Sequence, residues 1–143
     1  MLAQEDLKAI AFTLNSFNEE MYKWEMYCNN IDSDKSFSTE EKLEKQKSMV
    51  LGIFNKYCTK KDRKEGLPNI ISYPIIDGRD KPIEEEILSI EEIAENKAIV
   101  STQKKDSLQS KLQYLLIKKK GIWYIDSKKR YSNWKKKWLA QSL

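Results

Sequence analysis

Seven apolar residues, spaced alternately three and four positions apart, dominate the start of the chain. They are Leu7, Ile10, Leu14, Phe17, Met21, Trp24 and Cys28. This spacing places all seven on one stripe of a single α-helix, with no Gly or Pro to interrupt it. The sequence therefore predicts one long helix over residues 6–28, ended by the two asparagines that follow, and a broad apolar surface against which it packs.

A second helix is predicted to begin after Ser38. Ser38 suits the N-cap position, and Glu41, three residues later, completes a capping box. The apolar face that follows runs up to a Lys-rich segment and the Gly-Leu-Pro of residues 66–68, which end the helix. That face consists of Leu43, Val50, Ile53, Phe54 and Tyr57.

Beyond Gly66 the helical period is replaced by alternation. Residues 70–76 predict a short β segment broken by Pro74, and strands are expected at residues 84–93, 97–104, 109–118 and 122–126. Four strands at hairpin spacing predict a strongly bent antiparallel sheet. The tail, residues 133–143, carries Trp134, Trp138 and Leu139 at helical spacing and predicts a short docked helix.

Composition excludes several classes of function. The 143 residues fit a single domain, residues 1–143, and none of them is histidine. The absence of His excludes Ser-His-Asp and Cys-His catalysis and every zinc site that uses His. Cys28 and Cys58 are expected to be reduced, buried thiols, so no disulfide, metal or cofactor is predicted. No stretch approaches the length of a membrane span, and a cytoplasmic protein is expected.

Charge is distributed unevenly along the chain. Residues 1–100 hold 14 basic and 20 acidic side chains, a net charge of −6, whereas residues 101–143 hold 12 basic and 2 acidic ones, a net charge of +10. The basic, aromatic end suits nucleic acid or an acidic protein partner. Lysines that solvate the outer face of strands and a terminal helix explain the same pattern without a ligand.

Two helices followed by consecutive antiparallel strands define an α+β domain. This order resembles the nuclear transport factor 2-like fold, in which a curved sheet wraps around the first helix as a cone. The segments MYKWEMY (residues 21–27), IFNKYCTKKDR (53–63), AIVSTQKK (98–105) and GIWYIDSKK (121–129) together resemble the immunity proteins of this fold in bacterial polymorphic toxin systems. The resemblance extends over about residues 9–138.

The resemblance implies a cone of two or three N-terminal helices packed in a curved antiparallel sheet of about four to five strands. It also implies a non-enzymatic bacterial protein that binds and neutralises a cognate toxin domain inside the producing cell, with a homodimer as one possible state. The family motif residues with an implied structural role are Trp24, Glu25, Arg63, Trp123 and Asp126. A buried ion pair between Glu25 and Arg63 is one hypothesis from this match, since the Arg fork binds carboxylates in bidentate fashion.

Two acidic groups lie at the two ends of the strand predicted at residues 84–93, and they are the leading candidates for the toxin interface. They are Glu84, Glu85 and Glu86, then Glu91 and Glu92. Runs of this kind are most often solvated strand edges. If the toxin is a nuclease, however, carboxylates complement the basic groove that holds phosphate. An acidic toxin would instead suit the Lys-rich residues 118–120 and 128–130, and the sequence does not choose between the two.

Two other function classes remain open. The cone fold also hosts enzymes and small-molecule binders, and the acids in strand-like apolar surroundings are Asp126 and Glu86. The C-terminal Lys/Trp segment, residues 128–138, places aromatics between cations, a pattern that suits nucleic acid. The four-residue spacing of Trp134 and Trp138 argues against nucleic-acid binding, because it predicts that both lie on one buried helix face.

Overall fold

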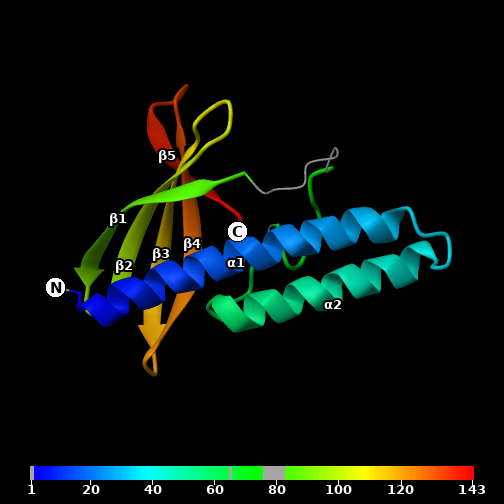
Figure 1. Cartoon of the computed structure of the whole chain (residues 1–143), viewed down its shortest axis with the longest axis horizontal. Coiled ribbons are helices and arrows are strands. Elements are labelled where there is room, and N and C mark those ends of the chain that lie inside the picture. Colours follow the sequence, from blue (N-terminus) through cyan, green and yellow to red (C-terminus); the bar gives the residue numbers. More distant parts are fainter. Residues whose placement is uncertain (1, 65, 76–82) are drawn as a thin grey trace. The chain divides into compact units, whose positions relative to one another are not determined.

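The computed structural model describes residues 2–64, 66–75 and 83–143. The helices are α1 (Gln4–Asp32) and α2 (Thr39–Tyr57). The strands are β1 (Glu85–Ala94), β2 (Lys97–Lys104), β3 (Lys111–Lys119), β4 (Ile122–Ser132) and β5 (Lys137–Gln141) (Figure 1). The chain divides into two compact units: a sheet unit, Met1–Leu14 with Ile83–Leu143, and a helical unit, Asn15–Pro82. This order of helices and strands confirms the predicted α+β class.

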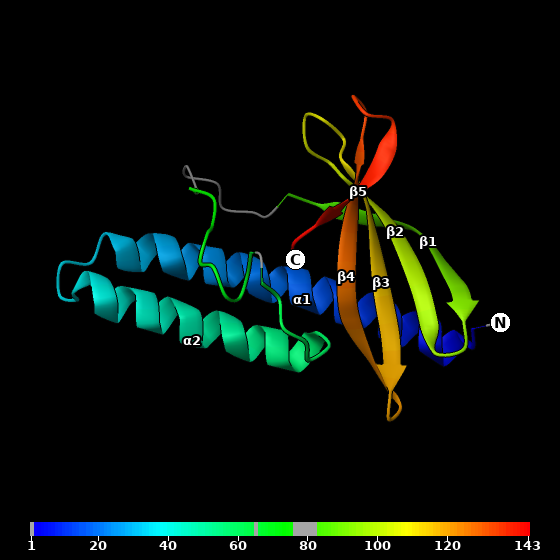
Figure 2. The ribbon, with the colours of Figure 1, turned by 180° about the vertical axis from the view of Figure 1, so that it is seen from behind.

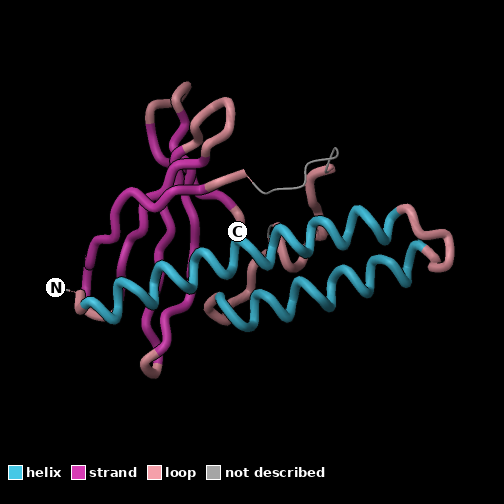
Figure 3. The backbone as a smooth tube through the Cα atoms, viewed as in Figure 1, coloured by secondary structure: helices cyan, strands magenta, loops and turns pink. Residues whose placement is uncertain are grey.

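The sheet is an antiparallel meander in the order β1-β2-β3-β4-β5 (Figure 3). Because each strand pairs with the next one in the chain, successive connections alternate between the two ends of the sheet. The β1–β2 and β3–β4 turns lie at one end. The β2–β3 loop and the β4–β5 turn lie at the other, where Figures 1 and 2 both show them next to each other.

One face of the sheet forms the core of the sheet unit. Alternate residues of the three central strands are buried there, together with Ile10 and Leu14 of α1. Asp6, near the start of α1, accepts hydrogen bonds from Trp123 Nε1 at 3.0 Å and from Lys118 Nζ at 2.9 Å. These bonds attach α1 to the sheet near the β3–β4 turn, so this end is called the Asp6 end. The buried strand residues are Ala98, Val100, Thr102, Leu112, Tyr114, Leu116, Trp123 and Ile125.

Strand β4 is longer than the prediction of residues 122–126, which was wrong about its end. The pairing with β3 shifts at Leu115/Leu116: Leu115 pairs with Ser127 and Leu116 with Ile125, so Asp126 is the extra residue of β4 at this point. This β-bulge adds one residue to β4 and bends it locally, and the strand continues through a polar run to Ser132. Asp126 is therefore a half-buried residue in mid-strand instead of the last residue of the strand.

The prediction of a C-terminal helix was also wrong. The chain reverses between Ser132 and Lys137, with Lys136 at a φ of 52°, and residues 137–141 pair with β4 as an edge strand. Trp138 lies opposite Tyr131 in this pairing, and their rings contact edge to face at 5.3 Å between centroids. Trp134 therefore lies in the β4–β5 turn and Trp138 in β5, so the two do not share a helix face, and Trp134 is exposed.

The helical unit contains the rest of α1 packed against α2. Phe17 on α1 contacts the rings of Phe54 and Tyr57 on α2 at 5.6 and 6.3 Å between centroids. The predicted capping box is confirmed: Ser38 Oγ accepts from Glu41 N, and Glu41 Oε1 accepts from Ser38 N, both at 3.1 Å. The fixed start of α2 sets where its apolar side begins.

Helix α1 extends four residues beyond its predicted end at residue 28. Asn29 does not end the helix: the helix continues through it to Asp32, and its side-chain amide donates to Glu25 O at 2.7 Å. Ile31, three residues after Cys28, continues the buried stripe to the last turn. Among the described residues, no helix is long and apolar enough to cross a bilayer.

The segment after α2 was predicted to contain a β strand, and the described part of it does not. Residues 71–75 form no strand, and Ile76 lies outside the described residues. Their hydrogen bonds go to helix side chains instead of a neighbouring strand. Tyr73 Oη donates to Asp32 and accepts from Gln46 Nε2, while Asn29 Nδ2 donates to Pro74 O at 3.0 Å. Burial, followed by the bond to Asp32, raises the pKa of Tyr73 to about 12.

Candidate functional site

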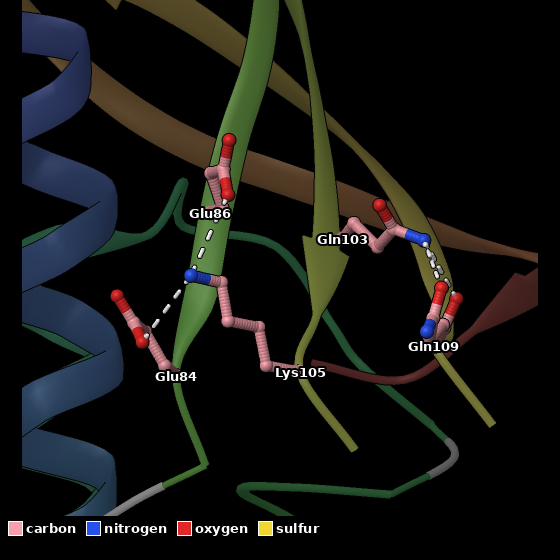
Figure 4. Close-up of polar contacts among 5 residues, drawn as sticks. All are labelled: Glu84, Glu86, Gln103, Lys105 and Gln109. Carbon is pink, nitrogen blue, oxygen red and sulfur yellow. Dashed lines mark hydrogen bonds and ion pairs between the residues drawn. The ribbon is translucent and has the colours of Figure 1, made fainter. Parts of the chain in front are cut away.

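The predicted acidic residues at the start of β1 lie at the end of the sheet opposite Asp6. Lys105, the first residue after β2, bridges two of them: its Nζ is 3.5 Å from Glu84 Oε2 and 3.7 Å from Glu86 Oε2 (Figure 4). The backbone N–H of Lys105 also donates to Glu84 O at 2.8 Å. All three side chains are exposed. This cluster therefore offers one cation between two carboxylates to a partner.

Glu85 has a different role from its neighbours, because adjacent strand residues point to opposite faces. Its Oε2 accepts hydrogen bonds from Thr102 Oγ1 and Tyr114 Oη, both at 2.7 Å. Thr102 and Tyr114 are buried, so the Glu85 carboxylate satisfies two hydroxyls that face the core. The structure therefore places Glu85 in the framework of the sheet and Glu84 and Glu86 on its surface.

Glu91 and Glu92 lie near the other end of β1, toward the β1–β2 turn. Both are exposed, and they pair in register with Ile99 and Ala98 of β2. They are five or more residues from Glu86, which corresponds to about 16 Å along an extended strand. The predicted acidic interface is thus divided into two surface groups with Glu85 turned away from the first.

The β2–β3 loop next to Lys105 is held by its own hydrogen bonds. Asp106 Oδ1 accepts from Ser110 N, and Oδ2 accepts from Ser110 Oγ, both at 3.1 Å. The backbone bond from Ser110 is the main reason that the pKa of Asp106 is lowered. Gln103 reaches across to Gln109, as Figure 4 shows. The loop therefore has a fixed shape, with Leu108 at its tip 78% exposed.

The β4–β5 turn presents a second large apolar side chain at this same end. Trp134 is 88% exposed, and the turn is fixed by a bond from Lys135 N to Ser132 Oγ at 3.1 Å. Three lysines follow Trp134 directly, at residues 135–137. The name Trp134 end is used below for this end of the sheet: residues 84–86, the β2–β3 loop at 105–110 and the β4–β5 turn at 133–136.

The five family-motif residues are distributed between the two units. In the helical unit, Trp24 is buried and donates from Nε1 to Gln46 O at 2.9 Å, and Arg63 Nη2 donates to Thr59 O and Oγ1 at 3.2 Å. Glu25 is half-buried on α1, and its ion pair with Arg63 stays a prediction. In the sheet unit, Trp123 is buried against Asp6, and Asp126 is the bulge residue of β4.

Two surface grooves run along the helical unit, with volumes of about 480 and 290 Å³. In the first groove Glu41 caps α2, and in the second Lys56 Nζ lies 3.6 Å from Glu20. Both cysteines are buried, and burial raises the pKa of Cys28 to about 12. Within the described ranges, no group of three or more Cys, Asp or Glu side chains is placed to hold a metal ion.

Sequence reasoning missed the residues that connect distant segments. Asp6 contacts Lys118 and Trp123 more than 110 positions away, and nothing in the local pattern around Asp6 indicates this. Leu108 lies in a polar loop where an isolated leucine was overlooked. A large apolar residue between turn residues, with no periodic neighbour, is the signal that would have found Leu108.

Comparison with known proteins identifies the class. The chain matches the family described as NTF2 fold immunity protein over residues 9–142, and it belongs to that family. The chain is also similar to one named immunity protein. Immunity protein RhsIA of Dickeya dadantii (strain 3937) is 29% identical over 130 residues, which cover 91% of this chain and 93% of the relative. No solved structure matches the chain.

Proposed function

We propose that this chain is a non-enzymatic immunity protein that binds a cognate bacterial toxin domain in the cytoplasm and neutralises it by protein–protein contact. The observation that carries the proposal is the family match over nearly the whole chain. The similarity to immunity protein RhsIA over more than nine tenths of both chains supports it. A homodimer and the absence of a cofactor stay predictions.

The acidic edge of the sheet is the proposed contact for a toxin with a basic surface. Glu86, Glu91 and Glu92 are exposed on β1, which is an edge strand of the sheet, and Glu84 is exposed directly before it. Carboxylates in this position accelerate encounter with a basic partner and suppress wrong ones. Glu85 contributes indirectly, because its bonds to Thr102 and Tyr114 hold the strand that carries the others.

The proposal is tested by co-expression with the toxin domain encoded beside this chain. We expect the wild-type chain to restore growth of cells that express this domain and to co-purify with it. Growth arrest that persists at equal toxin levels, with no complex recovered, would reject the immunity function.

A matched pair of variants tests the acidic contact separately. Glu84→Gln/Glu86→Gln and Glu91→Gln/Glu92→Gln remove the same charge from opposite ends of one strand. For a basic toxin, we expect the double variant whose substitutions lie nearer the contact to associate about three- to tenfold more slowly than the wild type at low salt. This difference in association rate should shrink above about 0.5 M salt, because the charges are screened. If neither pair changes the association rate, the acidic edge is not the contact, although the immunity function stands.

A further inference from the structure

Two large apolar side chains at the Trp134 end of the sheet lie mostly in solvent in the described part of the chain. Trp134 is 88% exposed and Leu108 is 78% exposed, so the core gains almost nothing from either. Single exposed apolar residues are ordinary on protein surfaces. These two, however, come from neighbouring connections at one end of the same sheet (Figures 1 and 2). Two interstrand spacings separate the connections, which corresponds to about 10 Å.

Both connections are fixed before any partner arrives. Asp106 receives two bonds from Ser110, and Gln109 N donates to Asp106 O at 3.1 Å. The β4–β5 turn is held by the bond from Lys135 N to the buried Ser132 hydroxyl. Binding through such loops avoids most of the entropy cost of ordering them. Leu108 and Trp134 are therefore presented in a set position, as interface anchors require.

The charge around the anchors changes sign across the sheet. From Lys128 onward the chain carries six basic residues and no acidic one, so the β4–β5 side is strongly positive. On the β1 side, Glu84 and Glu86 place two carboxylates around Lys105. A complementary partner has carboxylates facing β4 and β5 and cations facing β1. The five strands place these edges about 19 Å apart, which lies within the footprint of a standard interface of about 800 Å² per partner.

We propose that the toxin docks on the Trp134 end of the sheet, with Trp134 and Leu108 inserted into an apolar pocket that carboxylates border on the β4–β5 side. This inference rests on the proposed immunity function and names the surface that performs it. Trp is one of the residue types enriched among binding hot spots, which are surrounded by contacts that exclude water. Here the lysines at residues 135–137 and the Glu84–Lys105–Glu86 cluster form that rim.

A protein partner explains this surface better than a nucleic acid. Binding to single-stranded nucleic acid uses several aromatic platforms along a continuous basic groove. At this end Trp134 is exposed, whereas Tyr131 and Trp138 contact each other, and Glu84 and Glu86 would repel a phosphate backbone. A surface of mixed sign with two apolar anchors is typical of a specific protein interface.

The test compares matched exposed side chains at and away from the Trp134 end. Trp134→Ala is paired with Phe12→Ala, an aromatic residue of α1 that is 71% exposed, and Leu108→Ala with Ile122→Ala, which is 54% exposed beside the β3–β4 turn. The affinity of each full-length variant is measured calorimetrically for the toxin domain encoded beside this chain, recovered from its complex in denaturant and refolded. We expect Kd to rise about thirtyfold or more for Trp134→Ala and about tenfold for Leu108→Ala, with both controls within about threefold.

The outcomes separate this inference from the function on which it rests. If the wild-type chain binds the toxin and Trp134→Ala and Leu108→Ala bind equally well, the docking surface is wrong and the immunity function stands. If the wild-type chain does not bind at all, both are overturned. A labelled single-stranded oligonucleotide whose binding is lost in Trp134→Ala, with toxin affinity unchanged, would reassign this surface to nucleic acid and overturn the inference.

Discussion

The two ends of the sheet use the same kinds of residue in opposite ways. At the Asp6 end, Trp123 is 3% exposed and donates its indole N–H to Asp6, and Lys118 pairs with the same carboxylate at 2.9 Å. At the Trp134 end, a tryptophan and the lysines that follow it lie in solvent. The polar and aromatic groups of the first end are used to attach α1 to the sheet. At the second end, Trp134 and the lysines at residues 135–137 remain exposed to another molecule.

This difference shows why composition alone does not locate a binding surface. Both ends are rich in lysine and each carries a tryptophan, so a count of residue types does not distinguish them. The two ends differ in the contacts that their tryptophan and lysine side chains make with the rest of the chain. In immunity proteins of this kind, we expect the end with side chains not needed for packing to be the one that varies with the toxin.

The largest predicted contrast is between the two tryptophans. Trp123→Ala removes a buried ring and leaves a cavity, so we expect it to lower the free energy of unfolding by about 3–5 kcal/mol. Trp134→Ala removes an exposed ring, and we expect a change within about 0.5 kcal/mol. Urea denaturation followed by circular dichroism measures both. Equal destabilisation by the two variants would mean that the two ends do not differ as described.

A similar but smaller contrast is predicted within the acidic group at the start of β1. Glu85→Ala leaves the buried hydroxyls of Thr102 and Tyr114 without this acceptor, so we expect a loss of about 1–3 kcal/mol of unfolding free energy. Glu86→Ala, one position along the strand, serves as the control and is expected to change stability by less than about 0.5 kcal/mol. A larger effect for Glu86→Ala would reverse the assignment of the two side chains to framework and surface.

The smallest predicted effect is a pH dependence that originates at the Asp6 end. The bonds from Trp123 and then from Lys118 lower the pKa of Asp6 below its usual 3.8. The stability that Asp6 adds is therefore fully present above the unfolded pKa and is lost as the pH falls through 3.8 toward the lower folded value. We expect the difference in stability between wild type and Asp6→Asn to be constant from pH 7 to about 5 and to vanish well below pH 3.8.

The comparison with Asp6→Asn isolates this carboxyl from others whose pKa values are also lowered, such as those of Asp34, Glu41 and Asp106. Those groups titrate equally in both proteins and cancel in the difference. A difference that stays constant down to pH 2.5 would show that Asp6 is not held by Trp123 and Lys118.

Much of the fold was predictable because its signals are local. The α1 stripe, the Ser38–Glu41 capping box and the alternation in β2 each depend on residues within a few positions of one another. The errors arose where distant contacts decide the outcome. The spacing of Trp134 and Trp138 suits a helix, but the turn at residues 133–136 and the Tyr131–Trp138 contact make a hairpin. The bulge at Asp126 likewise depends on the pairing with β3.

The candidate site was predictable only as a set of residue types. The sequence placed the acids of residues 84–86 at a strand, in which Glu85 points to the opposite face from its neighbours. Which of the two faces is directed toward Thr102 depends on the register with β2. The Lys105 bridge depends on the same register. The exposure of Leu108 and Trp134 follows from where the loops end, which local periodicity does not encode.

Hydrogen–deuterium exchange of the chain, alone and in complex with its toxin domain, tests the central claim most directly. We predict that amides at residues 104–111 and 132–138, with those at the start of β1, become protected in the complex. The turns of the Asp6 end, residues 95–97 and 119–122, should exchange at unchanged rates. Protection confined to the Asp6 end or to the α1–α2 hairpin, with exchange at the Trp134 end unchanged, would contradict the claim that this end binds the toxin.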